Sequence, residues 1–176
     1  MNWVTFFSHT GSEIVNISNE LGRWPDKVIT NNLPGSDRIH EALDVIYLPD
    51  RPSLGDYVKH INPGDIITLH GWMRIVPPEL CKQMDIYNLH PGLITKHPEL
   101  KGADPQKKVF NNNKDYKEVG CVLHEVIPEV DEGKVLMSTQ VYNNFYNEKL
   151  LTKKLHDIAK DMWVQFLKTK LHEYNR

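Results

Sequence analysis

The sequence predicts one α/β domain with a mostly parallel central sheet and helices on both faces. Two observations predict it: short β-favouring runs alternate with helical periodicity, and the length of 176 residues is that of one compact domain. The alternation is clear at the start, where residues 3–7 precede a helix marked by Ile14, Ile17 and Leu21. Strands joined through helices form right-handed crossovers, which place them parallel in one sheet.

The expected elements of the first half follow in chain order. The strand at residues 3–7 ends in a glycine loop, residues 8–12, before the first helix. A second strand is expected at residues 27–30, a short helix at 36–42 behind Pro34-Gly35, and a third strand at 44–48. A fully buried parallel strand is expected at residues 65–70, and another strand is expected at residues 85–89.

The second half has a different character. Residues 91–117 are rich in Pro, Lys, Asn and Gly, and a segment of this kind is expected to form a long functional or mobile loop. Residues 120–127 and 134–142 then resemble a hairpin or a pair of edge strands. A long closing helix is expected at residues 148–172, because apolar residues recur there on one stripe, namely Leu151, Leu155, Ile158, Met162 and Phe166.

Composition narrows the functional classes. Lys plus Arg total 21 against 23 for Asp plus Glu, so the net charge of -2 gives no general attraction to nucleic acid. The two cysteines, Cys81 and Cys121, form no CxxC pair and suggest neither a zinc site nor a disulfide framework. No signal-peptide pattern and no membrane-spanning apolar run is recognised, so a cytoplasmic protein is expected.

Asn88 and His90 are the first candidates for chemistry. Alternation along the strand points both side chains to the same side, at the carboxyl end of the strand, where open α/β sheets bind ligands. A histidine can exchange a proton near neutral pH, and an asparagine amide can donate to a developing oxyanion. The alternative from spacing alone is a partly buried, hydrogen-bonding histidine before a proline turn.

Two turns carry weaker signals. Residues 128–134, which include Asp131, form an acidic turn between the late strands, and a solvated turn is the simpler interpretation. The turn of Gly11, Ser12 and Glu13 opens a helix and offers backbone N–H groups to an anion, although a plain strand-to-helix turn explains it equally well.

Taken in order, several motifs resemble the glycinamide ribonucleotide formyltransferase family and, more loosely, the folate-dependent formyltransferases. They are residues 8–12 (SHTGS), 72–78 (WMRIVPP), 88–91 (NLHP), 124–126 (HEV) and 131–136 (DEGKVL). The resemblance implies a single Rossmann-like domain that uses 10-formyltetrahydrofolate as co-substrate and needs no metal. It also implies an acceptor half at residues 1–90, folate and catalytic loops at 91–147, and a C-terminal helix at 148–176.

The resemblance also implies roles for individual residues. Asn88, His90 and Asp131 would be catalytic, and the carboxylate of Asp131 would raise the pKa of His90. His124 is expected to lie near Asp131 and support it, although an ordinary strand histidine explains this position equally well. A pterin-binding wall would comprise Met73, Arg74, Ile75, Val76, Ile127, Val130 and Asp131. The phosphate of the acceptor would lie against Thr10, Gly11, Ser12 and Glu13.

Several alternatives stay open at this point. Glu13 stands where the resembling family usually has an amide side chain, and residues 92–106 resemble the loop of transfer-RNA and sugar formyltransferases. An amino sugar nucleotide or a modified nucleotide is therefore a second possible acceptor. A formyltetrahydrofolate hydrolase and a non-catalytic folate-binding module are further alternatives, and the protein can be a monomer or a homodimer.

Overall fold

The computed structural model describes residues 1–36, 39 and 43–172, and its centre is a seven-stranded sheet in the order β3-β2-β1-β4-β5-β6-β7. The neighbours from β3 to β5 pair in parallel, whereas β6 is antiparallel to both β5 and β7. The predicted, mostly parallel sheet with a late antiparallel pair is thus confirmed. The strands are β1 (Trp3–Phe7), β2 (Lys27–Thr30), β3 (Val45–Tyr47), β4 (Ile66–His70), β5 (Asp85–His90), β6 (Glu118–Glu125) and β7 (Val135–Tyr142).

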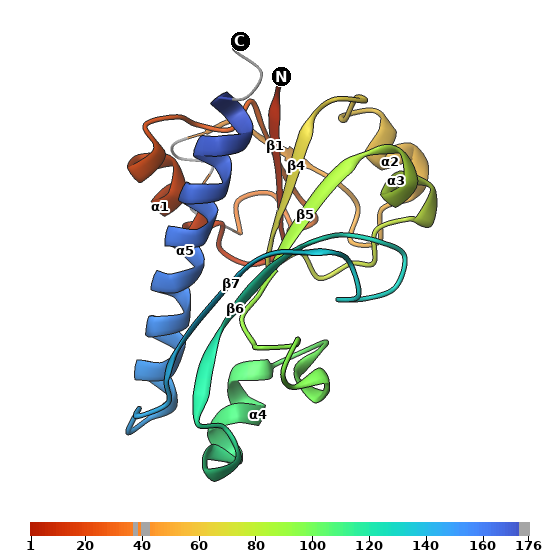
Figure 1. The fold of residues 1–176 in the computed structure, drawn as a ribbon. Coiled ribbons are helices and arrows are strands. Elements are labelled where there is room, and N and C mark those ends of the chain that lie inside the picture. The colour runs from red at the N-terminus through yellow and green to blue at the C-terminus, as the bar shows by residue number, and fades with distance from the viewer. Residues whose placement is uncertain (37–38, 40–42, 173–176) are drawn as a thin grey trace.

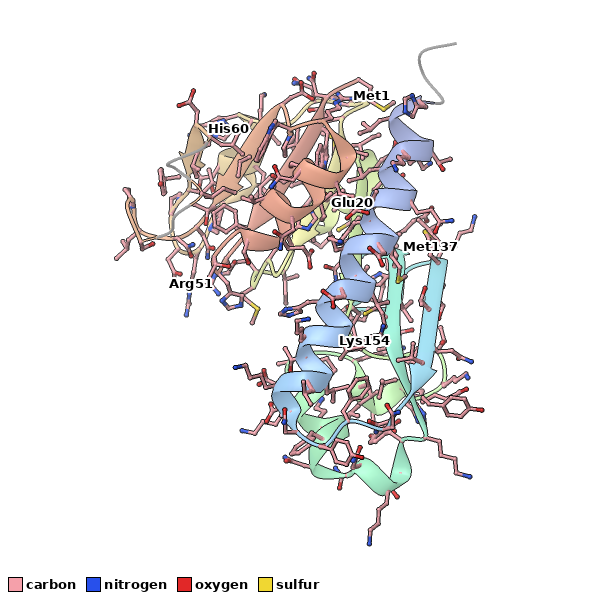
Figure 2. The ribbon with its side chains drawn as sticks, turned by 90° about the vertical axis from the view of Figure 1, so that its left-hand side faces the viewer. Met1, Glu20, Arg51, His60, Met137 and Lys154 are labelled. Carbon is pink, nitrogen blue, oxygen red and sulfur yellow. The ribbon has the colours of Figure 1, made fainter. Side chains whose placement is uncertain are left out.

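Helices cover both faces of this sheet. One face carries α1 (Ser12–Leu21) and α5 (Glu148–His172), and the other carries α2 (Leu54–Val58) and α3 (Pro78–Gln83), as Figure 1 shows. The long α5 extends along both the parallel strands and the β6–β7 pair (Figure 2). A further helix, α4 (Pro105–Asn111), lies beyond the end of β5 (Figure 1).

The parallel strands are buried on both sides, and this explains why β1 and β4 read as continuous apolar runs. Successive residues therefore enter different cores. Ile66 packs in the cluster under α5, together with Trp3 and Trp163, while Ile67 packs in the cluster with Trp72 beneath α3. Burial of these apolar side chains is the main force that holds the helices on the sheet.

The sequence prediction was wrong for the long loop at residues 91–117. This segment contains α4 and two 3-10 turns, Pro98–Leu100 and Asn113–Asp115. Prolines begin both α4 and the first turn, where a missing N–H costs no hydrogen bond, so these residues start short helices and do not prevent them. The helix expected at residues 36–42 falls largely outside the described residues, because 37, 38 and 40–42 are not described.

Two short helices, α2 and α3, had no counterpart in the sequence prediction. A capping box of Ser53 and Asp56 starts α2, and Pro78 starts α3 after Pro77. Both helices are too short, at 5 and 6 residues, to display helical periodicity. The late strands β6 and β7 also differ by one to two residues from the expected bounds of 120–127 and 134–142.

Candidate active site

The site lies at the carboxyl end of β5, where the acidic turn after β6 returns to the sheet. Asp131 Oδ2 lies 3.3 Å from His90 Nδ1, and the two side chains are only 8% and 7% exposed. The carboxylate is therefore buried against the imidazole, and the interpretation of residues 128–134 as a simple solvated turn is wrong for Asp131. Asn88 precedes His90 by two residues, and its carboxamide has no hydrogen-bond partner within the described part of the chain.

Local geometry aims the Asp131 carboxylate inward. The residue has a left-handed backbone with φ of 55°, a conformation that Asp tolerates better than most residues. The N–H of Gly102 donates to Oδ2 at 2.9 Å. On the other side, Nε2 of His124 lies 3.4 Å from Oδ1, an ion-pair contact that falls short of hydrogen-bond geometry. His124 stands opposite Asn88 in the β5–β6 register, so all four side chains gather at one place.

The hydrogen bonds of His90 fix which ring nitrogen exchanges a proton. Nε2 lies 2.7 Å from the carbonyl oxygen of Leu100, and because a carbonyl can only accept, Nε2 carries a proton. Nδ1 is therefore the atom that gains and loses a proton beside Asp131. Sequence reasoning expected a raised pKa here, but burial of the ring lowers the pKa of His90 and outweighs the attraction of Asp131.

Asp131 shows the opposite balance. Burial alone raises the pKa of its carboxyl group, but the His124 ring, the Gly102 N–H and the His90 ring together lower it below its ordinary value. The carboxylate therefore stays ionised near neutral pH while the adjacent imidazole is neutral. A neutral base beside a fixed negative charge is suited to accept a proton from a reacting amine.

The predicted pterin wall is only partly exposed. Met73, Ile75 and Val130 present apolar side chains that are 52%, 74% and 54% exposed. Arg74 is engaged by the carbonyl and carboxylate of Asp50, and Val76 is buried in the core. The predicted wall therefore has exposed apolar side chains, and Arg74 and Val76 hold its first segment against the rest of the protein.

A surface hollow lies next to these residues. It is lined by residues 81–87, from α3 to the first half of β5, by Glu125 at the end of β6, and by Val126 and Ile127, which follow it. Its residue nearest in sequence to the catalytic candidates is Tyr87, which precedes Asn88. Ile127 thus lies in this hollow, and exposed Val130 belongs to the turn that also carries Asp131.

The polar groups of the predicted acceptor loop contact one another. The hydroxyls of Thr10 and Ser12 are 2.8 Å apart, and the Ser12 N–H donates to Thr10 Oγ1. Gly11 has a φ of 69°, and a Cβ there would lie 2.9 Å from Ile39 Cδ1, so the turn requires glycine. Glu13 points to His70, with Oε1 and Nδ1 2.7 Å apart.

His70 is a residue that sequence reasoning missed, and it links the predicted acceptor loop to the core of the sheet. The Trp3 indole donates to Thr68 Oγ1 at 2.9 Å, and Thr68 Oγ1 lies 2.8 Å from His70 Nε2. The other ring nitrogen, Nδ1, lies 2.7 Å from Glu13 Oε1. The His70 side chain therefore holds Glu13 in place beside the predicted anion site.

In the described ranges, no group of three or more His, Cys, Asp or Glu side chains could hold a metal ion. No helix among the residues with described placement has both the length and the apolar character needed to cross a membrane.

Comparison with known proteins places this geometry in context. Residues 48–167 match the family model described as "Formyl transferase". A phosphoribosylglycinamide formyltransferase of Dictyostelium discoideum is 34% identical over 97 residues, which cover 50% of this chain and 46% of that protein. The chain thus spans less than half the length of this relative.

Solved structures resemble the whole fold. Phosphoribosylglycinamide formyltransferase from Anaplasma phagocytophilum superposes with a TM-score of 0.78 at 20% identity, covering 94% of this chain and 84% of that one. The enzyme of the same name from Streptococcus pneumoniae TIGR4 gives 0.77 at 21% identity, covering 97% and 99%. These likenesses confirm the predicted architecture.

Proposed function

This chain belongs to the formyl transferase family, and from that premise we propose that it transfers a formyl group from 10-formyltetrahydrofolate to a primary amine. The observation that carries the proposal is the contact of 3.3 Å between His90 Nδ1 and Asp131 Oδ2, at the strand end that also presents Asn88. The relatives named above make glycinamide ribonucleotide the first acceptor to test.

Each side chain of the trio has a definable task. Bound 10-formyltetrahydrofolate supplies an amide-like formyl carbon. The amine nitrogen bonds to this carbon, and the bond between the formyl carbon and the folate nitrogen breaks. The Asn88 amide donates to the formyl oxygen as that oxygen gains charge. His90 accepts the amine proton at Nδ1 and returns it to the departing folate nitrogen, and Asp131 stabilises the imidazolium in between. The products are an N-formyl amine and tetrahydrofolate, and the proton balance is closed.

Ile127, which lines the hollow, and the exposed apolar side chains of Met73, Ile75 and Val130 suit the flat, partly apolar ring system of a folate. We assign the folate to these side chains and to the catalytic loops of 91–147. The acceptor is assigned to the strand ends of residues 1–90. Both substrates then meet at the carboxyl edge of β5, as a direct transfer requires.

A second acceptor class is favoured by one observation, the Glu13 side chain, which directly follows the loop of Thr10, Gly11 and Ser12 and is held there by His70. A carboxylate repels a phosphate unless a cation lies between them. An amine whose contacting group is a hydroxyl or an ammonium, as on an amino sugar nucleotide, suits this loop better than a phosphate does.

The test is formyl release from 10-formyltetrahydrofolate, followed by folate absorbance, with purified protein and a panel of amines. The proposal predicts release only when an amine is present, and comparison of glycinamide ribonucleotide with amino sugar nucleotides separates the two acceptor classes. Release without an amine indicates a hydrolase. Binding of formylfolate without release under any condition indicates a non-catalytic module and contradicts the proposal.

A further inference from the structure

The turn at residues 99–102 contacts both partners of the His90–Asp131 pair through its backbone. The carbonyl of Leu100 accepts from His90 Nε2 at 2.7 Å, and the N–H of Gly102 donates to Asp131 Oδ2 at 2.9 Å. Gly102 has a φ of 82°, which turns its N–H toward Asp131 without a side-chain penalty. The geometry of the pair therefore depends on the backbone of residues 100–102.

Lys108 of α4 forms hydrogen bonds to the backbone of this turn. Its ammonium group donates to the carbonyl of Glu99 at 3.2 Å and to that of Lys101 at 3.3 Å, the two carbonyls on either side of Leu100. With its neighbours turned toward Lys108, the Leu100 carbonyl remains available for His90. Figure 1 shows that α4 lies beyond the end of β5.

The charge of Lys108 also acts on the imidazole. The charged and titratable groups that face His90 are Asp131 and His124, from the β6 side, and Lys108, from α4. Asp131 favours the protonated ring, whereas Lys108 and His124 disfavour it, as does burial, which is the largest effect and lowers the pKa of His90. Lys108 thus contributes to keeping the ring neutral.

We propose that Lys108 is a positioning residue that fixes the turn at residues 99–102, so that His90 keeps its proton on Nε2 and exchanges protons at Nδ1. The catalytic consequence rests on the proposed formyl transfer, but the effect on the ring does not. Lys107 provides a matched control, because it is the preceding lysine on the same helix, is exposed, and its side chain makes no hydrogen bond or ion pair within the described residues.

The experiment measures the ring nitrogens of His90 by ¹⁵N NMR in the full-length protein, with the signal assigned by its loss in His90→Gln. In the wild type we expect the Nε2–H tautomer. In Lys108→Met we expect mixed tautomers and a protonation midpoint at higher pH. Lys108→Arg should restore the wild-type spectrum, because its guanidinium can reach both carbonyls and keeps the charge, and Lys107→Met should leave it unchanged.

Activity provides the second readout. Lys108→Met should lower kcat for formyl transfer by about tenfold or more with little change in KM for the folate, because a misplaced proton acceptor affects the chemical step. An unchanged His90 spectrum in a folded Lys108→Met variant would overturn the proposal. If Lys108→Met does not fold, Lys108→Gln replaces it, because glutamine keeps a hydrogen-bond donor without the charge. This variant must raise the protonation midpoint of His90, and an unchanged midpoint overturns the proposal. Should the spectra change as expected while the wild type shows no transfer, the function fails and the positioning role stands.

Discussion

Gly133 should be required to keep the Asp131 carboxylate in place, although it lies two residues away along the chain. A Cβ atom at this position would lie 1.7 Å from the backbone oxygen of Glu125, where contacts below 3.0 Å do not occur. Gly133→Ala must therefore push the two backbones apart by more than about 1 Å, since packed interiors do not absorb such an overlap. The bond from the Glu125 N–H to the Lys134 carbonyl, now 2.9 Å, breaks at that separation.

The displacement enters the turn two residues from Asp131, and a misplacement of about 1 Å near the chemistry costs about 10²-fold in turnover. Overpacking adds a stability loss of about 1–3 kcal/mol. The assay is kcat of formyl transfer, measured well below the melting temperature of each variant. Gly120→Ala is the comparison, because its Cβ would lie 1.8 Å from the Thr139 oxygen in the same strand pair, away from Asp131. Wild-type turnover in Gly133→Ala would refute the reasoning. So would an equal loss of turnover in Gly133→Ala and Gly120→Ala when both variants are folded.

Three further predictions concern the charged groups. His90→Ala and Asp131→Asn should each lower kcat by about 10²-fold or more while formylfolate binding, measured by calorimetry, is largely retained; normal turnover removes that residue from the mechanism. Glu13→Gln should tighten binding of a phosphorylated acceptor, and Glu20→Gln, which removes an equal charge two turns along α1, should not; equal effects would show that Glu13 does not face the acceptor. Because burial holds the pKa of His90 below its ordinary 6.5, this residue favours folding above that pH, and its contribution is lost as pH falls toward the lowered value. The loss of unfolding free energy below pH 6.5 should be smaller in His90→Gln than in the wild type.

Much of the fold could be predicted because its strongest signals are long or repeated. The long helix α5 could be predicted from its stripe of Leu151, Leu155, Ile158, Met162 and Phe166, since a helix that packs on a sheet must present one apolar face. The parallel strands read as apolar runs because both of their faces are buried. Helices of one or two turns leave no such pattern, so α2, α3 and α4 depend on capping residues and prolines, which were not recognised as starts.

The residues of the candidate site likewise include some that the sequence predicts and some that it does not. Asn88 and His90 could be placed together, because alternation along one strand fixes their common side. The approach of Asp131 could be expected only from the resemblance to known formyltransferases, since it depends on how a turn folds back. The sequence did not indicate the contacts of Lys108, because its partners are backbone carbonyls, which any residue provides. It did not indicate the contact of His70 either, because its partner, the Glu13 carboxylate, is 57 residues away in the sequence.

The direction of the His90 pKa follows from a competition that sequence reasoning weighed wrongly. A nearby carboxylate favours imidazolium, but the ring is 7% exposed and loses most of its hydration, and this second effect wins. The outcome suits a transfer that begins with deprotonation of an amine, because a resting imidazolium cannot accept a proton. Asp131 then contributes where charge appears, when Nδ1 has taken the proton and the new cation lies 3.3 Å from a carboxylate oxygen. Burial and ion pairing therefore act at different steps: burial keeps the base free before the reaction, and Asp131 stabilises the acid that the reaction creates.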